Sequence, residues 1–351
     1  MTYSSDDKRL LYTGRIDHRK DGAYFYFPSS SVKVVFKGSS IGIIINNKNA
    51  WGNTSIGYII DGRMGRLPLR LNEDGTDAGY TIAERLDPDK VHECLIYKRM
   101  AANHSFALKS IYMEGELLQA EDTSRLSLEF YGDSVSAGEV TEADAFVGQP
   151  DPCCAEGIYD NSWYSYTWQV SRLLNARFHN ISQGGIAVFD DTGWFHGPKM
   201  IGMESVYDKM CYFPEGGELT DWDFSRYTPD ICIFALGQND QHNGITNADD
   251  ISIYDPDTRT RWKEGYKKLV KDVISHYPHD TRVIMITTVL MHDREWDNAI
   301  DEIVNELRTE GINAYHFLFS RNGAATPGHP RRAEHSEMAS ELARFIESIE
   351  K

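Results

Sequence analysis

The spacing of the apolar residues changes near residue 122, and this change constrains the fold more strongly than any other feature of the chain. Before it, short runs rich in β-branched and aromatic residues are separated by turn residues and contain no convincing amphipathic helix. These runs are VKVVF (32–36), IGIIIN (41–46), SIGYII (55–60), HECLIYK (92–98) and FALKSIYM (106–113). We therefore predict that residues 1–122 form an all-β sandwich of two packed antiparallel sheets.

After residue 122 the chain alternates between strands and amphipathic helices. The predicted strands are LSLEFY (126–131), RFHNI (177–181), DICIFAL (230–236), RVIMITTV (282–289) and INAYHFLF (312–319). Apolar helix faces follow at 163–174, 262–274, 300–307 and 338–346. This alternation is typical of a parallel sheet covered by helices on both faces, a three-layer α/β fold. A chain of 351 residues exceeds what one core usually supports, so we predict a second domain at residues 123–351.

The net charge of the chain limits the classes of molecule that it can bind. A formal net charge of -17 gives nucleic acid, anionic membranes and polyanionic substrates no electrostatic gain, whereas neutral small molecules or glycans fit. No stretch approaches the ~20 apolar residues of a membrane span, and MTYSSDDKRLLYTGR lacks the apolar core of a signal peptide. We therefore expect a cytoplasmic protein, or a secreted one if a leader was removed. The five cysteines lack metal-ligand spacing, so no metal is expected.

Polar and glycine residues follow four of the predicted strands in the second domain. They are Gly132-Asp133-Ser134, Ser182-Gln183-Gly184-Gly185, Gly237-Gln238-Asn239-Asp240, and the loop RNGAATPGHP, which carries His329. Each segment alone reads as an ordinary turn or loop. However, ligand sites of open parallel sheets lie outside the carboxyl ends of the strands, and all four segments reach that edge in the predicted fold.

These segments contain the parts of a serine hydrolase. Ser134 can attack an ester carbonyl, and His329 can act as general base and then protonate the leaving alcohol. The amides of Ser134 and Gly185 and the side chain of Asn239 can surround the oxyanion, and a glycine at 185 lets the backbone approach closely. We assign Asp133 and Asp240 to support of these loops. His242, close to Asn239 in the sequence, is the rival base.

The same residues resemble a known family. GDSVSAGE is similar to the first signature block of the GDS-type esterases, or SGNH hydrolases, with Ser134, Gly185, Asn239 and His329 at their four named positions. Together with DNSWYSY, NISQGGIAV, GQND, GHP and the preceding β-sandwich, it resembles carbohydrate esterase family 2. The resemblance implies a jelly-roll first domain, a five-stranded SGNH domain, and removal of acetyl groups from O-acetylated plant polysaccharides or xylo-, manno- or gluco-oligosaccharides. It implies no metal and no cofactor. A lipase or lysophospholipase of the GDS type, and a carbohydrate-binding protein on a degenerate scaffold, are the alternatives.

One position departs from the wider pattern. Most GDS-type esterases place an aspartate three residues before the histidine, where this chain has Thr326. Some family 2 members use a serine–histidine dyad in which a backbone carbonyl holds the imidazole N–H. The resemblance therefore implies a Ser134–His329 dyad, and the competing interpretation is a decayed enzyme.

Three aromatic residues are candidates for contact with a sugar ring. Tyr131, Trp194 and Trp296 could form a platform for its C–H face, although packing in the core or in loops is the alternative for each. The sequence does not identify the sugar, the acetylated hydroxyl or the oligomeric state, and a homo-oligomer stays open.

Overall fold

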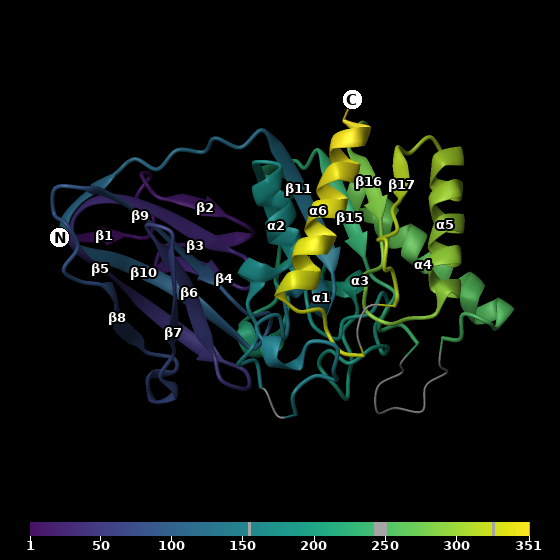
Figure 1. Cartoon of the computed structure of the whole chain (residues 1–351), viewed down its shortest axis with the longest axis horizontal. Helices are drawn as coiled ribbons and strands as arrows, with labels where there is room; N and C mark the ends of the chain where they lie inside the picture. Colours follow the sequence, from purple (N-terminus) through teal and green to yellow (C-terminus); the bar gives the residue numbers. More distant parts are fainter. Residues whose placement is uncertain (154–155, 242–250, 325–326, 351) are drawn as a thin grey trace. The chain divides into compact units, whose positions relative to one another are not determined.

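The computed structural model describes residues 1–153, 156–241, 251–324 and 327–350, which divide into two units (Figure 1). The first unit contains Met1–Thr123 and two short segments from later in the chain, Glu156–Ile158 and Met210–Thr220. The remaining residues form the second unit. The sequence pattern predicted a boundary after residue 122 but did not indicate that later segments return to the first unit.

The first unit is built on antiparallel strands that form a single ten-stranded sheet. The order along its main path is β3-β4-β10-β5-β9-β6-β7, while β1 pairs with β10, and β2 and β8 pair with β5. The strands are β1 Thr2–Ser4, β2 Leu11–Thr13, β3 Ile16–Arg19, β4 Gly22–Phe25, β5 Ser31–Asn49, β6 Ser55–Ile60, β7 Arg63–Pro68, β8 Asp77–Ala83, β9 Val91–Lys98 and β10 His104–Leu118. The antiparallel β architecture is thus present, but hydrogen bonds through β5 join all ten strands, so the expectation of two distinct sheets is corrected. The jelly-roll topology stays a prediction.

Strand β5 joins two of the predicted strands into one. The side chains that it adds to the hydrophobic cluster are even-numbered from Val32 to Phe36 and odd-numbered from Ile41 to Ile45. Because side chains alternate along a strand, such a change of parity requires a bulge. The bulge lies near Gly38, where a Cβ atom would come within 2.2 Å of the carbonyl oxygen of Glu114. Both halves of β5 can therefore line the same core.

The return of residues 210–220 to the first unit has a clear physical basis. Tyr212 stacks on Phe27 with ring centroids 4.4 Å apart, and Phe213 packs edge-on against Tyr26. All four of these aromatic side chains are buried. The segment begins and ends at a two-stranded sheet of β13 (Lys209–Cys211) and β14 (Thr220–Asp221).

The second unit contains a five-stranded parallel sheet, which confirms the parallel sheet predicted from the sequence. Its strand order is β12-β11-β15-β16-β17. Their bounds are β11 Leu126–Gly132, β12 Ala176–Ser182, β15 Ile231–Ala235, β16 Arg282–Met285 and β17 Ala314–His316. All five fall within or overlap the predicted runs, most of which are nearly continuous apolar stretches, as expected for strands buried on both faces.

Four long helices correspond to the four predicted apolar faces. The helices of the unit are α1 Ser134–Ala137, α2 Tyr166–Leu173, α3 Met203–Val206, α4 Pro256–Ile274, α5 Arg294–Thr309 and α6 Arg332–Ile349. Helix α2 packs against α6, and α4 packs against α5. Figure 1 shows α6 crossing in front of the sheet beside α2.

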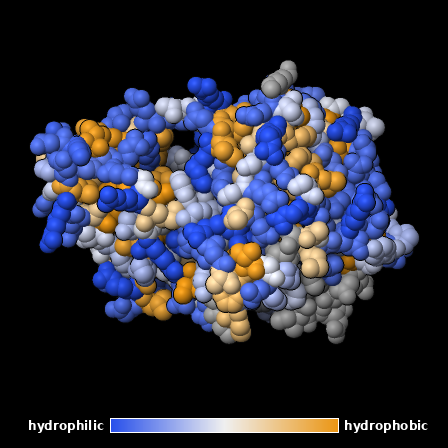
Figure 2. All heavy atoms as spheres, in the orientation of Figure 1, coloured by the Kyte–Doolittle hydropathy of each residue, from blue (hydrophilic) through white to orange (hydrophobic). Residues whose placement is uncertain are grey.

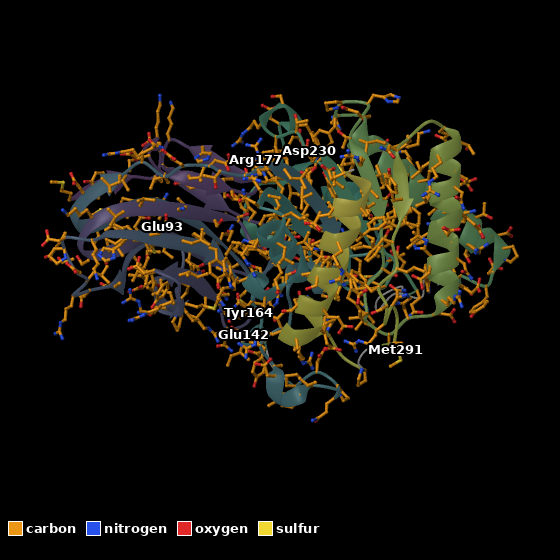
Figure 3. All side chains as sticks on the ribbon, turned by 45° about the horizontal axis from the view of Figure 1, so that its top comes forward. Glu93, Glu142, Tyr164, Arg177, Asp230 and Met291 are labelled. Atoms are coloured by element: carbon orange, nitrogen blue, oxygen red, sulfur yellow. The ribbon has the colours of Figure 1, made fainter. Side chains whose placement is uncertain are left out.

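The two ends of the parallel sheet carry different residues. Figure 3 shows Arg177 and Asp230 at one end, where β12 and β15 begin. Glu142, Tyr164 and Met291 lie at the opposite end, beyond the carboxyl ends of β11 and β16. The second end is the one that the sequence pattern predicts to hold a ligand site.

On the face drawn in Figure 2, hydrophilic residues predominate and hydrophobic residues form small separate patches. Across the part of the chain that the structure describes, no helix has both the length and the apolar character needed to cross a bilayer.

Candidate active site

Ser134 lies where strand β11 turns into helix α1. The strand ends at Gly132, the carboxylate of Asp133 caps the helix by accepting a 3.0 Å hydrogen bond from the Val135 N–H, and Ser134 is the first helical residue. Residue 132 is glycine because a Cβ there would lie 2.3 Å from the hydroxyl oxygen of Ser136. This sharp strand-to-helix turn places the Ser134 side chain at the carboxyl edge of the sheet.

His329 reaches the same place from the loop before α6. Its Nε2 atom lies 2.7 Å from Oγ of Ser134, which is the contact a general base needs to remove the hydroxyl proton. The structure thus brings together the two residues that the sequence pattern paired, although 195 residues separate them along the chain.

The orienting group of His329 is a carboxylate, so the expectation of a backbone carbonyl at this position is wrong. Oδ2 of Asp151 lies 2.6 Å from Nδ1 of His329, and Oδ1 accepts a 3.0 Å hydrogen bond from the His329 backbone N–H. An ionised carboxylate only accepts hydrogen bonds, so Nδ1 carries the proton and Nε2 is free to accept the one from Ser134.

The carboxylate that orients His329 lies in a part of the chain that the sequence pattern did not single out. Asp151 follows α1 in a loop, whereas the usual position three residues before the histidine is Thr326, which lies outside the described residues. Asp293, which follows β16, caps α5 and accepts a 2.5 Å hydrogen bond from the Tyr254 hydroxyl.

Arg331 fixes the acid and the histidine together. Its side chain is fully buried, and its guanidinium donates a 2.8 Å hydrogen bond to Oδ1 of Asp151 and another to the carbonyl of His329. Burial alone would raise the pKa of Asp151, but the hydrogen bonds from His329 and Arg331 lower that pKa to about 2. Burial would lower the pKa of His329, whereas the hydrogen bond to Asp151 and the nearby charge of Glu139 raise it. The site therefore favours a carboxylate beside a basic imidazole.

Three donors lie on adjacent loops where an oxyanion would form. In the parts of the chain that the structure describes, the N–H groups of Ser134 and Gly185 have no protein acceptor. The Asn239 amide donates a 3.0 Å hydrogen bond to the carbonyl of Ile186, which joins the second loop to the third and leaves its other N–H available. Gly185 has φ of 74°, and its carbonyl accepts a 2.7 Å hydrogen bond from the Trp194 N–H. These three groups stay the proposed oxyanion donors.

The buried carboxyl groups of Asp133 and Asp240 connect the loops of the site through hydrogen bonds. The second oxygen of Asp133 accepts a 2.7 Å hydrogen bond from the side chain of Gln238, whose own oxygen accepts one from the Thr288 N–H. Oδ1 of Asp240 accepts hydrogen bonds of 2.9 Å from the Val188 N–H and from the indole of Trp262. Burial raises the pKa of both aspartates to about 6.

The three aromatic candidates differ in their exposure to solvent. Tyr131 and Trp296 are 0% and 2% exposed, so neither can be a surface platform for a sugar, and that expectation is corrected. Tyr131 stacks on Phe234 and Trp296 packs edge-on against Trp262, which explains their burial. Trp194 is 55% exposed and is anchored next to Gly185, so it alone of the three can meet a ligand.

Two further expectations concern a rival base and a metal ion. The rival base His242 lies outside the described residues. Within the described ranges, no group of three His, Cys, Asp or Glu side chains is arranged to hold a metal ion.

Comparisons with known proteins relate this chain to carbohydrate esterases. Residues 12–120 match the family described as carbohydrate esterase 2 N-terminal. The cellulase/esterase CelE of Acetivibrio thermocellus is 25% identical over 364 residues, which cover 99% of this chain and 40% of that protein. An acetylxylan esterase / glucomannan deacetylase of Cellvibrio japonicus is 23% identical over 353 residues, which cover 99% of this chain and 91% of that protein. The chain thus spans 40% of the length of the first relative and nearly all of the second.

A solved structure shares the fold. A family two carbohydrate esterase from Clostridium thermocellum, in complex with cellohexaose, superposes with a TM-score of 0.79 at 24% sequence identity, over 97% of this chain and 98% of that one. These comparisons confirm the resemblance to carbohydrate esterase family 2, and the solved structure shows the shared fold.

Proposed function

We propose that this chain, a relative of carbohydrate esterase family 2, is a serine esterase that removes O-acetyl groups from neutral plant polysaccharides or their oligosaccharides. The observation that carries the proposal is the chain of contacts from Asp151 to His329 to Ser134, with heavy-atom distances of 2.6 Å and 2.7 Å. A Ser–His–Asp triad of this geometry activates a hydroxyl for attack on an acyl carbon. We propose this triad in place of the expected dyad.

The first half of the proposed reaction forms an acetyl-enzyme. Oγ of Ser134 attacks the carbonyl carbon of the acetyl ester while Nε2 of His329 takes the hydroxyl proton. The carbonyl oxygen becomes an oxyanion, which the N–H groups of Ser134 and Gly185 and the Asn239 amide stabilise. The tetrahedral intermediate then expels the sugar oxygen, which receives the proton from His329 and leaves as a free hydroxyl.

The second half releases acetate. A water molecule gives a proton to Nε2 of His329 and attacks the acetyl carbon, and the second tetrahedral intermediate expels Ser134, which regains its proton. Throughout, Asp151 remains ionised, holds the proton on Nδ1 and stabilises the imidazolium that forms in each step.

The substrate class rests on the relatives and on charge. One relative is named an acetylxylan esterase / glucomannan deacetylase, and a similar structure was solved with cellohexaose. A net charge of -17 disfavours anionic glycans and so supports a neutral one. We assign the exposed ring of Trp194 as a platform for a sugar, because it is fixed beside the proposed oxyanion donor Gly185.

The test uses one variant and two series of substrates. Ser134→Ala removes one hydroxyl and no core atoms, so it should abolish release of acetate from 4-nitrophenyl acetate while the circular dichroism spectrum stays unchanged. Mass spectrometry of acetylated xylo-, manno- and gluco-oligosaccharides before and after incubation then gives the sugar and the position of the ester. Wild-type turnover by a folded Ser134→Ala protein would contradict the serine mechanism. A preference for long-chain over acetate esters would instead favour a lipase-type activity.

A further inference from the structure

Glu139 is fixed to the catalytic turn but has no part in the mechanism so far. It follows Gly138, which ends α1 in the left-handed conformation with φ of 86°. The Glu139 N–H donates a 3.0 Å hydrogen bond to the carbonyl of Ser134, so the backbone of Glu139 is tied directly to the proposed nucleophile.

The side chain of Glu139 lies against the loop that carries the oxyanion donor. A Cβ atom added to Gly184 would lie 1.8 Å from Oε1 of Glu139 and 2.6 Å from Oε2. The carboxyl group therefore occupies the space in which any other residue at 184 would place its side chain. Since Gly185 is the next residue, this carboxyl group sits beside the proposed oxyanion hole.

The carboxyl group of Glu139 differs from its acidic neighbours in having no hydrogen-bond donor among the described residues. Asp133 and Asp151 accept hydrogen bonds from Gln238 and Arg331, as described above. Asp160 accepts a 2.9 Å hydrogen bond from the Val140 N–H. The Glu139 side chain is also only partly buried, so a ligand can reach an unused polar group.

The same carboxyl group is coupled electrostatically to the histidine. Burial and the adjacent Asp160 raise the pKa of Glu139, while His329 opposes that rise. In return, the charge of Glu139 contributes to raising the pKa of His329. Together with the contact at Gly184, this coupling puts Glu139 beside the space between His329 and that loop.

That space is where the leaving sugar has to lie. The oxygen that departs from the ester must be next to Nε2 of His329 to receive its proton, while the acetyl oxygen points toward Gly185. We propose that Glu139 is a specificity-determining residue whose carboxyl group binds a free hydroxyl of the acetylated sugar, beside the ester that Ser134 attacks. This inference rests on the proposed function.

The contact would distinguish sugars from simple alcohols. A carboxyl group can accept a hydrogen bond from a hydroxyl and, when protonated, can also donate one, so it suits the hydroxyls that flank an ester on a sugar ring. A chromogenic ester such as 4-nitrophenyl acetate has the same acyl group but no such hydroxyl. Loss of the Glu139 side chain should therefore affect the two substrates differently.

The experiment compares kcat/KM for an acetylated xylo-oligosaccharide and for 4-nitrophenyl acetate in the full-length chain. Burial raises the pKa of Glu139 to about 8, so the carboxyl group is largely protonated at neutral pH. Glu139→Ala should therefore lower kcat/KM for the oligosaccharide by about 10-fold, the upper end for a hydrogen bond between uncharged groups, and change the chromogenic ester by less than about threefold. Glu139→Gln, which keeps the shape and hydrogen-bonding capacity, should recover part of the loss. Equal losses on both substrates, or no loss on either, would overturn the proposal.

Two controls separate this result from other failures. Glu142→Gln alters a carboxylate on the same loop that accepts a 2.8 Å hydrogen bond from Asn161, and it should leave both substrates unchanged. A wild-type chain that hydrolyses neither substrate would contradict the proposed function itself. A wild-type chain active on both, with a Glu139→Ala variant that loses both equally, would contradict only the role of Glu139.

A double-mutant cycle tests the position of the side chain independently. Gly184→Ala forces its new methyl group into the Glu139 carboxyl group and should reduce oligosaccharide turnover on its own. In the Glu139→Ala background the same methyl group has room, so Gly184→Ala should add little further loss. Additive losses would show that Glu139 does not occupy the assigned place.

Discussion

Oδ2 of Asp151 lies 2.6 Å from Nδ1 of His329, although 178 residues separate the two in the chain. The orienting group is therefore a side chain that a substitution can remove, which makes the role of the acid directly measurable.

Replacement of the acid should nearly abolish turnover. We expect Asp151→Asn to lower kcat for 4-nitrophenyl acetate by up to about 10⁴, because an amide can hold His329 in the tautomer that cannot accept the serine proton. Asp293→Asn, in the cap of α5, is the matched control and should stay within a few-fold of wild type. Turnover within threefold of wild type in a folded Asp151→Asn protein would show that another group orients the histidine.

The pH dependence of the reaction should report on the same pair. His329 must be neutral to act as a base, and its pKa is raised above the ordinary value of 6.5 by Asp151 and Glu139. We therefore expect kcat/KM to rise with pH through a midpoint above 6.5. Asp151, with a pKa lowered to about 2, is ionised throughout this range, and its removal makes the imidazolium less stable, so the residual activity of Asp151→Asn should show a midpoint at lower pH. A midpoint that stays in place would mean that the Asp151 charge does not raise the pKa of the histidine.

Arg331 should matter for stability as well as for rate. Loss of one partner of a buried ion pair costs about 3–5 kcal/mol, and we expect about 2 kcal/mol for Arg331→Met because the Asp151 side chain is 32% exposed. Urea denaturation measures this change. The variant should also lose turnover, because Asp151 is no longer fixed. Arg332→Met, which breaks an exposed pair with Asp144, serves as control and should cost less than about 1 kcal/mol.

Gly185 should tolerate no side chain. An alanine there would combine a φ of 74° with a Cβ atom 2.8 Å from that of Trp194, so it should displace the oxyanion donor and lower kcat by at least about 10². Gly62→Ala has a similar φ of 77° but meets no atom within 4 Å, and it isolates the effect of backbone strain. Equal kinetics for Gly185→Ala and wild type would remove Gly185 from the site.

Much of this arrangement was predictable because it follows from local patterns. The five parallel strands are recognisable as apolar runs, and the turn at Gly132 to Ser134, with His329 in its own loop, lies where strand ends must converge. The resemblance to a family paired Ser134 with His329, and the structure brings their side chains within 2.7 Å of each other.

The parts that escaped prediction depend on contacts between distant segments. Asp151 lies in a loop with no periodic pattern, and only its partners Gly328 and Arg331 mark its place. A Cβ at Gly328 would lie 2.5 Å from the Asp151 carboxylate. The glycine therefore indicates the position of the acid, but only once the fold is known. Likewise, the buried rings of Tyr131 and Trp296 cannot be told from exposed ones by residue type. The bulge that joins two predicted strands into β5 depends on Gly38 approaching Glu114.

The return of residues 210–220 to the first unit limits how the chain can be divided. A gene cut after codon 123 would encode the ten main strands but not Tyr212, and the ring of Phe27 would lose its stacking partner. The two units are therefore interleaved in the sequence. Efforts to exchange the second unit for another, or to fuse the first unit to a different protein, would have to carry this segment along as a separate insert.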